Sequence, residues 1–335
     1  MDPLLLIVIG LALLFAFSNG FHDTSSVVAN SVASRALTPF YALILATAFN
    51  FIGALIGEGI AHRLGEGLIE YPRGQSQVLP LLAAAVLAAL LWNLFTWWLA
   101  LPSSSTHALI GGLLGAGLVT GAVTHWETLL TVILLPLVVS PLVGFLVSML
   151  VAYLVIRLVA RAAPAALFSN FRSIQSFSTA ALALAHGIQD AQKTAAVIMM
   201  ALAADDAWRL NDGDTLEVSW TVRIMVAIAL AVGTYTGGWR IVRTMGERLA
   251  KIDPVRGFVS DVVSSSVLYI AAFVLRAPIS MTYTVTSSIV GAAVPGRRRP
   301  VDLRVLAPIV GSWIVSLPAT AILAGGFGWL FTLSG

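Results

Sequence analysis

The stretch Pro80-Leu-Leu-Ala-Ala-Ala-Val-Leu-Ala-Ala-Leu-Leu-Trp-Asn-Leu-Phe-Thr-Trp-Trp-Leu-Ala-Leu-Pro-Ser-Ser-Ser-Thr-His107 leads from a long apolar run into a proline and four consecutive hydroxyl residues. It belongs to a larger region, between Arg73 and Glu127, that contains no Asp, Glu, Lys or Arg. A membrane-spanning helix needs about 20 predominantly apolar residues. This region is therefore long enough for two helices, and the polar turn lies between them.

The composition of the whole chain supports a membrane protein. Of its 335 residues, 58% are hydrophobic and 10% are charged, whereas an ordinary soluble domain has about 25% charged residues. Mean hydropathy is +0.92. The chain has no cysteine, which excludes disulfides and thiolate metal sites. Residues Met1–Gly20 lack a basic start and a small-residue cleavage site, so we expect them to form a retained first span.

The expected fold class is an all-α polytopic membrane protein with about ten membrane elements. We expect two of these elements to be interrupted at the membrane midplane, near Asn19–Asp23 and near His186–Asp190. The predicted elements cover residues 3–35, 39–60, 78–100, 104–122, 128–156, 177–203, 219–239, 258–276, 280–295 and 305–331.

The distribution of basic residues predicts the orientation. Cytoplasmic loops of membrane proteins carry an excess of Lys and Arg. With ten elements, one face receives 13 basic residues, including Arg297–Arg299, and the other face receives 5. We therefore predict a multi-pass protein of the cell inner (plasma) membrane with both termini extracytoplasmic.

An internal repeat organises the chain. Asn19-Gly-Phe-His-Asp23 corresponds to His186-Gly-Ile-Gln-Asp190, and Pro102-Ser-Ser-Ser-Thr-His107 corresponds to Pro278-Ile-Ser-Met-Thr-Tyr283. Halves of five crossings each must have opposite orientations, because five is odd. Inverted repeats with interrupted helices are a recurring plan of secondary transporters, which bind substrate between the halves. The predicted domains are a first inverted repeat (1–158), a cytoplasmic linker (159–176) and a second inverted repeat (177–335).

The hydroxyl-rich segments can be interpreted in two ways. Ser and Thr are good N-caps, so each segment could be an ordinary tight turn before a helix. Alternatively, each starts a half-helix inside the membrane, where free N–H groups and the positive end of the helix dipole face an anion. The presence of two copies favours an anion site between two helix starts that face each other.

Two acidic residues, Asp23 and Asp190, lie within apolar elements. Ionisable residues in membrane segments are costly and indicate function by default, although Asp190 could also be a structural acid neutralised by Lys193. A carboxylate near a bound oxyanion repels it strongly at low dielectric. Cations bound between them would remove this repulsion, so the sequence predicts that anion and cation bind together.

The chain resembles the inorganic phosphate transporter (PiT) family, bacterial type. The similarity lies in Asn19-Gly-Phe-His-Asp-Thr-Ser-Ser-Val-Val-Ala-Asn30, in Ala180-Ala-Leu-Ala-Leu-Ala-His-Gly-Ile-Gln-Asp-Ala-Gln-Lys193, and in Trp92-Asn-Leu-Phe-Thr-Trp97 followed by Leu101–Gly112. The resemblance covers nearly the whole chain. It implies phosphate uptake by sodium or proton symport with alternating access.

The resemblance also assigns residues. The implied phosphate-binding residues are Ser104, Ser105, Thr106, Ser280, Met281 and Thr282. The implied cation-binding residues are Asn19, Asp23, Gln189 and Asp190, with Asp23 and Asp190 as metal ligands if the cation is sodium. No cofactor is implied apart from bound Na+.

Three residues depart from the family pattern. Met281 replaces a usual Thr, Tyr283 a usual His, and Gln189 a usual Asn. Because the family includes sulfate carriers, a sulfate or other oxyanion symporter is an alternative, and a passive anion channel is another. An enzyme is not expected, since the motifs of intramembrane aspartyl and serine proteases are absent from the sequence. The expected partners are phosphate or sulfate, Na+ or H+ and the lipid bilayer, with no nucleic acid; a homo-oligomer is compatible with the sequence.

Overall fold

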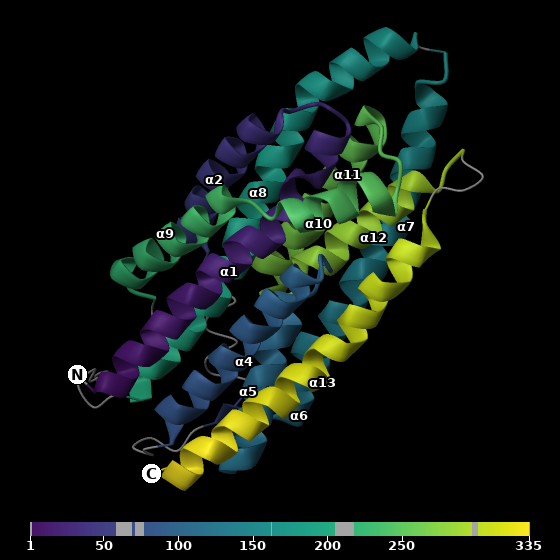
Figure 1. Cartoon of the computed structure of the whole chain (residues 1–335). Helices are drawn as coiled ribbons and strands as arrows, with labels where there is room; N and C mark the ends of the chain where they lie inside the picture. The colour runs from purple at the N-terminus through teal and green to yellow at the C-terminus, as the bar shows by residue number, and fades with distance from the viewer. Residues whose placement is uncertain are drawn as a thin grey trace.

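The described residues fold almost entirely into helices, and most of the long helices run along one long axis (Figure 1). The computed structural model describes residues 2–57, 69–70, 77–161, 163–204, 218–296 and 301–334. The last three residues of the segment predicted over 39–60 lie outside this part, as do Arg297–Arg299. The α-helices are α1 (Pro3–Ala33), α2 (Pro39–Ile56), α4 (Val78–Trp98), α5 (Ser105–Thr120), α6 (Trp126–Thr128), α7 (Leu135–Leu158), α8 (Pro164–Ala204), α9 (Trp220–Thr236), α10 (Trp239–Arg243), α11 (Pro254–Tyr269), α12 (Met281–Ala293) and α13 (Leu303–Ser334).

Three π-helical segments and two short strands complete the described secondary structure. The π-helical segments are η1 (Leu129–Leu134), η2 (Thr244–Leu249) and η3 (Ile270–Leu275). Strands β1 (Ile69–Glu70) and β2 (Val123–Thr124) form one antiparallel pair. Part of the linker predicted over 159–176 belongs to α8, which begins at Pro164.

Six helical stretches in the described part of the chain are long and apolar enough to cross a membrane. A seventh is obtained if α9 and the following α10–η2 segment, which bend by 57° at Gly237–Gly238, count as one span. The ten predicted elements are helical where described, but the count of ten spans is not confirmed. Helices α5 and α12 have only 16 and 13 residues, and α8 carries the polar sequence His186–Lys193 at its centre.

The predicted interruptions in the first and sixth elements are wrong. Helix α1 continues through Asn19–Asp23, and α8 continues through His186–Asp190. Neither segment contains a proline, so the backbone hydrogen-bond ladder is not forced to break. The hydroxyls of α1 bond to carbonyls of their own helix, as Ser18 does to Phe15 (2.8 Å) and Ser25 to His22 (2.7 Å). The polar side chains of these motifs therefore project from intact helices.

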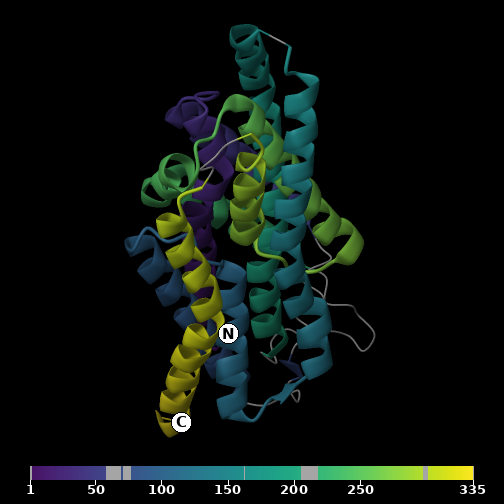
Figure 2. The same ribbon diagram turned by 90° about the vertical axis from the view of Figure 1, so that its right-hand side faces the viewer.

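The chain instead reverses at the two hydroxyl-rich segments. Helix α4 ends at Trp98 and α5 begins at Ser105; η3 ends at Leu275 and α12 begins at Met281. Each connection contains a non-glycine residue with positive φ, Ala100 (57°) in the first and Arg276 (49°) in the second. Figures 1 and 2 show α5 and α12 toward opposite ends of the molecule along its long axis, so the two short helices extend away from each other.

Glycines on α1 and α8 allow matched close packing between the two halves of the chain. A Cβ atom at Gly20 of α1 would lie 2.3 Å from the Leu230 carbonyl oxygen of α9, and one at Gly187 of α8 would lie 2.2 Å from the Asn50 carbonyl oxygen of α2. Only glycine permits so close an approach of one backbone to another. The two signature motifs are therefore fixed by equivalent helix pairs, α1 with α9 and α8 with α2.

The short helices are held in the same matched way. A Cβ atom at Gly115 of α5 would lie 1.9 Å from the Ala321 carbonyl oxygen of α13, and one at Gly291 of α12 would lie 2.2 Å from the Phe145 carbonyl oxygen of α7. Each short helix thus packs against the last long helix of the other half. This packing determines where the two helix starts lie.

Candidate functional site

The first turns of α5 and α12 have the same cap. Ser104 Oγ accepts a hydrogen bond from the His107 N–H (3.1 Å), and Ser280 Oγ accepts one from the Tyr283 N–H (3.3 Å). The other N–H groups at a helix start have no partner within their own helix, and the dipole gives this end a positive partial charge. The interpretation of both segments as N-caps is therefore confirmed, and the anion site at the two helix starts stays a prediction.

The two helix starts meet inside the protein. Thr106 Oγ1 donates to the Ile279 carbonyl oxygen (3.3 Å), and His107 Nδ1 lies 2.5 Å from the Tyr283 hydroxyl. The Tyr283 hydroxyl also donates to the Trp313 carbonyl oxygen (3.0 Å), and its ring stacks on Trp313 with centroids 4.1 Å apart. Segments far apart in sequence are thereby joined at one point.

Asp23 of α1 connects the two helix starts. Its Oδ2 atom accepts from Ser105 Oγ (3.1 Å), and its Oδ1 atom accepts from Thr282 Oγ1 (3.0 Å). His22 Nδ1 lies 3.0 Å from the same Oδ1 atom. The side chain of Asp23 is 2% exposed, so its charge is removed from solvent and surrounded by neutral hydroxyls and an imidazole.

Asp190 of α8 has a different environment. The Lys193 ammonium lies 2.5 Å from Asp190 Oδ1, and His186 Nε2 lies 3.2 Å from Oδ2. Lys193 Nζ also donates to Thr106 Oγ1 (2.8 Å) and to Ser105 Oγ (3.4 Å). The lysine therefore links the second acid to the start of α5.

The two acids lie close enough to share a cation. Asp23, His186 and Asp190 each present a ligand atom, and these three atoms lie within 4.8 Å of one another. Carboxylate oxygens suit hard cations. The residues predicted as metal ligands, Asp23 and Asp190, are thus brought together, and His186 joins them.

Three other predicted residues have partners outside this cluster. Asn19 Oδ1 accepts from Asn93 Nδ2 (2.7 Å), and Gln189 Nε2 donates to the Leu268 carbonyl oxygen (3.2 Å). Met281 is buried in a hydrophobic cluster with Ile279. Its side chain therefore supplies no polar contact, and only its backbone N–H, at the first position of α12, can face an anion.

Sequence reasoning missed part of the polar cluster. His186 had no predicted role, and Lys193 was considered only as a neutralising neighbour of Asp190. The signal for both is their helical spacing, since His186 precedes Asp190 by four residues and Lys193 follows it by three. Residues at these spacings lie on one face of a helix.

A third buried acid lies apart from these contacts. Asp261 of α11 accepts from Asn30 Nδ2 (2.7 Å), Ser178 Oγ (3.2 Å) and Thr179 Oγ1 (3.4 Å). The N-cap of α11 is Asp253, so Asp261 is not a cap. Its three partners connect α11 to α1 and α8.

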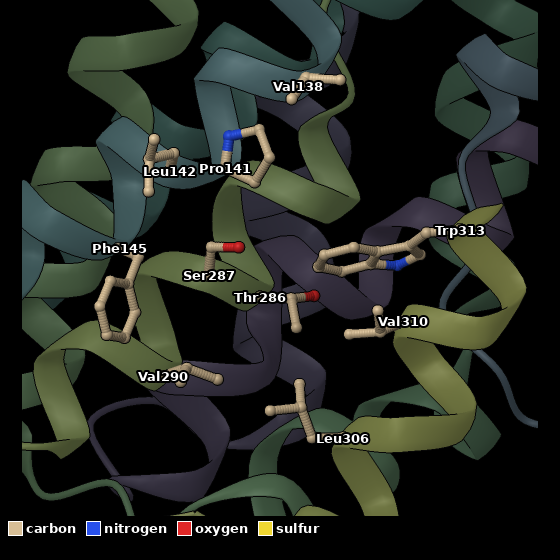
Figure 3. A pocket seen from close by; sticks show the side chains of 10 residues that line it. All are labelled: Val138, Pro141, Leu142, Phe145, Thr286, Ser287, Val290, Leu306, Val310 and Trp313. Atoms are coloured by element: carbon tan, nitrogen blue, oxygen red, sulfur yellow. The ribbon is translucent and has the colours of Figure 1, made fainter.

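The described residues also form an apolar cavity of about 400 Å³ between α7, α12 and α13 (Figure 3). Pro141 and Phe145 line it from α7, Thr286 from α12, and Trp313 from α13. None of the predicted phosphate- or cation-binding residues lines it. Because its walls are apolar, this cavity is not a candidate anion site.

Comparison with known proteins supports what the geometry indicates. Residues 19–324 match the Phosphate transporter family. The matched range includes both hydroxyl-rich helix starts and both acids, Asp23 and Asp190. The chain belongs to the phosphate transporter family. It is therefore a multi-pass membrane protein of a family of transporters, not of enzymes, as the sequence predicted.

Individual relatives cover almost the whole chain. A probable low-affinity inorganic phosphate transporter of Rhizobium meliloti is 38% identical over 96% of this chain and 95% of its own length. The protein of the same description in Bacillus subtilis is 34% identical over 96% of each chain. A solved structure, entitled the sodium-dependent phosphate transporter, has 22% identity and a TM-score of 0.87 and covers 98% of this chain and 99% of its own. At this identity it supports the fold.

The cap of α12 can be tested against an equivalent cap elsewhere. In Ser280→Ala we expect a loss of about 1 kcal/mol in the free energy of unfolding, together with reduced anion uptake, because the cap orients the helix start. Ser219→Ala is the matched control, since Ser219 Oγ caps α9 by accepting from the Val222 N–H (3.3 Å). Thermal unfolding should show similar destabilisation in both variants. Uptake should be reduced only in Ser280→Ala. Equal uptake in the two variants would contradict a role for the α12 start.

Proposed function

We propose that this protein takes up inorganic phosphate together with a cation, sodium or proton, by alternating access. The observation that carries the proposal is the position of Asp23, whose carboxylate accepts hydrogen bonds from the first turns of both α5 and α12. Those two helix starts supply the donors for a tetrahedral oxyanion. The predicted residues Ser104, Ser105, Thr106, Ser280 and Thr282 all belong to these turns or cap them.

The charges at this point explain why anion and cation would bind together. Two carboxylates no more than 4.8 Å apart repel by about 3 kcal/mol or more at an effective dielectric of about 20. Lys193 offsets the charge of Asp190, but a bound phosphate adds further negative charge beside Asp23. A cation bound at these carboxylates lowers this repulsion. Phosphate binding and cation binding therefore favour each other, which is the thermodynamic basis of symport.

Sodium is the first cation to test. The oxygen atoms of Asp23 and Asp190 suit a hard cation, and the structurally similar transporter is described as sodium-dependent. A proton remains the alternative, because either cation would neutralise a carboxylate at this point.

Alternating access requires two parts that can move against each other around the site. The paired packing of α1 with α9 and α8 with α2, and of α5 with α13 and α12 with α7, supports an arrangement of two inverted repeats. We place the boundary of the repeats in the segment 159–176, as the sequence predicts, with the basic loops cytoplasmic, both termini extracytoplasmic and the plasma membrane as location. Figure 1 is compatible with this topology, since both termini lie toward the same end of the molecule.

Sulfate is the second candidate substrate. Met281 stands at the first position of α12 with its side chain in a hydrophobic cluster, so residues 280–282 offer one hydroxyl fewer than residues 104–106. A site with fewer donors is less selective between tetrahedral oxyanions, because selectivity depends on how many polar groups are left unpaired by the wrong substrate.

The decisive experiment is uptake of radiolabelled phosphate into proteoliposomes with imposed sodium or proton gradients and excess sulfate as competitor. We expect gradient-driven accumulation that sulfate does not block. Uptake of sulfate in place of phosphate would retain the mechanism and change the substrate. Dissipation of an anion gradient without any cation dependence would indicate a channel and overturn symport.

A further inference from the structure

We propose that the Lys193 ammonium permanently fills the cation position at Asp190, so that only the half of the site around Asp23 takes a cation from solution. This inference rests on the proposed function, since it concerns how many cations accompany the anion. It assigns Lys193 as the residue that sets the coupling stoichiometry.

The position of the ammonium is that of a bound cation. Lys193 Nζ lies 2.5 Å from Asp190 Oδ1 and donates to Thr106 Oγ1 at 2.8 Å. Lys193 and Asp190 are 1% and 0% exposed. A buried ion pair of this kind persists only with further hydrogen bonds, and here the start of α5 supplies them. The lysine therefore contacts both an acid of the predicted cation site and a predicted anion-binding residue.

The first half of the chain has no equivalent cation. The residue three positions after Asp23, in the place that Lys193 occupies after Asp190, is Ser26, and its hydroxyl donates to Met245 Sδ (3.4 Å). The hydrogen bonds described for Asp23 come from the hydroxyls of Ser105 and Thr282 and involve His22. In the described part of the chain, no lysine or arginine is paired with Asp23. The two acids are thus equivalent in the repeat but unequal in charge.

The difference between Asp190, which has a lysine partner, and Asp23, which has none among the described residues, determines how much negative charge cations from solution must balance. The charges of Asp190 and Lys193 offset each other, whereas no lysine or arginine in the described part of the chain pairs with Asp23 beside the two helix starts. The Lys193 ammonium already lies 2.5 Å from Asp190 Oδ1. A further cation bound at this oxygen would lie close to the ammonium, and like charges so close repel strongly. Loss of the lysine charge would therefore create a requirement for one additional cation.

The test is phosphate binding by the purified full-length protein, measured calorimetrically over a series of sodium concentrations, with choline chloride keeping the ionic strength constant. We expect Lys193→Ala to bind phosphate at least about tenfold more weakly in choline, one decade being 1.4 kcal/mol. Its affinity should recover with sodium, and the plot of log Kd against log sodium concentration should be steeper than that of the unaltered protein by about one ion. Lys193→Gln provides the same test if the alanine variant does not fold.

Three further variants separate charge from structure. Lys193→Arg keeps the positive charge and should keep the slope of log Kd against log sodium concentration seen in the unaltered protein. Lys251→Gln removes a positive charge from an exposed residue and should also keep this slope. The double variant Asp190→Asn with Lys193→Ala removes both charges and should abolish the additional sodium requirement. An unchanged slope in both Lys193→Ala and Lys193→Gln, or a steeper slope that persists in the double variant, would overturn the proposal.

A second readout distinguishes this proposal from the proposed function. Without phosphate, sodium should raise the thermal unfolding temperature of Lys193→Ala more than that of the unaltered protein, because an added cation binds the folded state alone. Failure of the unaltered protein to bind phosphate would reject the proposed function, whereas sodium stabilisation equal in the two proteins would reject the role of Lys193.

Discussion

Replacement of Asp23 with asparagine is expected to lower cation-coupled phosphate uptake by about a hundredfold or more, because it removes the negative charge that holds the cation at the two helix starts; a hundredfold loss corresponds to about 2.8 kcal/mol. Ser105 and Thr282 donate to different oxygens of Asp23, so the single oxygen of asparagine keeps one of these hydrogen bonds and its NH2 group faces the other hydroxyl, which can accept instead. The asparagine cannot hold a cation between the starts of α5 and α12. The measurement is initial uptake into proteoliposomes as a function of the imposed cation gradient.

Asp302→Asn is the control for this variant. Asp302 is exposed at the start of α13, where its Oδ1 atom accepts from the Arg304 N–H (2.9 Å), and asparagine preserves this acceptor. The control removes the same charge far from any predicted ligand, so uptake should stay unchanged. If Asp23→Asn retained full gradient dependence, the cation would have to bind elsewhere, and the coupling proposal for Asp23 would be rejected.

Replacement of Gly20 with alanine is expected to destabilise the protein by about 1–3 kcal/mol, the range for inserting a methyl group where there is no space. The new Cβ atom would lie 2.3 Å from the Leu230 carbonyl oxygen and 2.7 Å from the Thr234 nitrogen. Both are backbone atoms, so α1 and α9 must separate. Because Gly20 precedes Asp23 by less than one turn, uptake should fall as well.

Gly10→Ala provides a matched control within the same helix. A Cβ atom at Gly10 would meet no heavy atom within 4 Å, and alanine is favoured over glycine in a helix by up to about 1 kcal/mol. Thermal unfolding in detergent should therefore show a lower midpoint for Gly20→Ala and an equal or higher midpoint for Gly10→Ala. Similar midpoints for the two variants would mean that α1 and α9 can separate without cost.

Much of the fold could be predicted from sequence because its signals are local. The apolar run before Trp98, the proline at 102 and the hydroxyl residues that follow it predicted a helix end and a new helix start, and α5 begins at Ser105. The repeat at 278–283 predicted a second start in the same way, and α12 begins at Met281. N-capping depends on a few consecutive residues, so such starts can be recognised without knowledge of packing.

The wrong prediction of interrupted helices has a specific cause. Polar residues at Asn19–Asp23 and His186–Asp190 suggested unwound backbone, but Gly20 and Gly187 serve the approach of neighbouring helices instead. A glycine in a helix can mark either a break or a close contact, and only the position of the partner helix distinguishes them. The span count was affected similarly, because short helices such as α12 are stabilised by neighbours and not by their length.

The sequence by itself determined that the chain is a helical membrane protein with duplicated motifs, that each copy of the first motif carries an acid, Asp23 or Asp190, and that two helix starts are rich in hydroxyls. These properties depend on composition, on apolar run length and on residues adjacent along the chain. The tertiary structure alone decided that Asp23 lies between both helix starts and that Lys193 reaches Thr106 from a separate helix. Such contacts depend on how closely helices pack around their glycines, and that distance is set by the whole bundle.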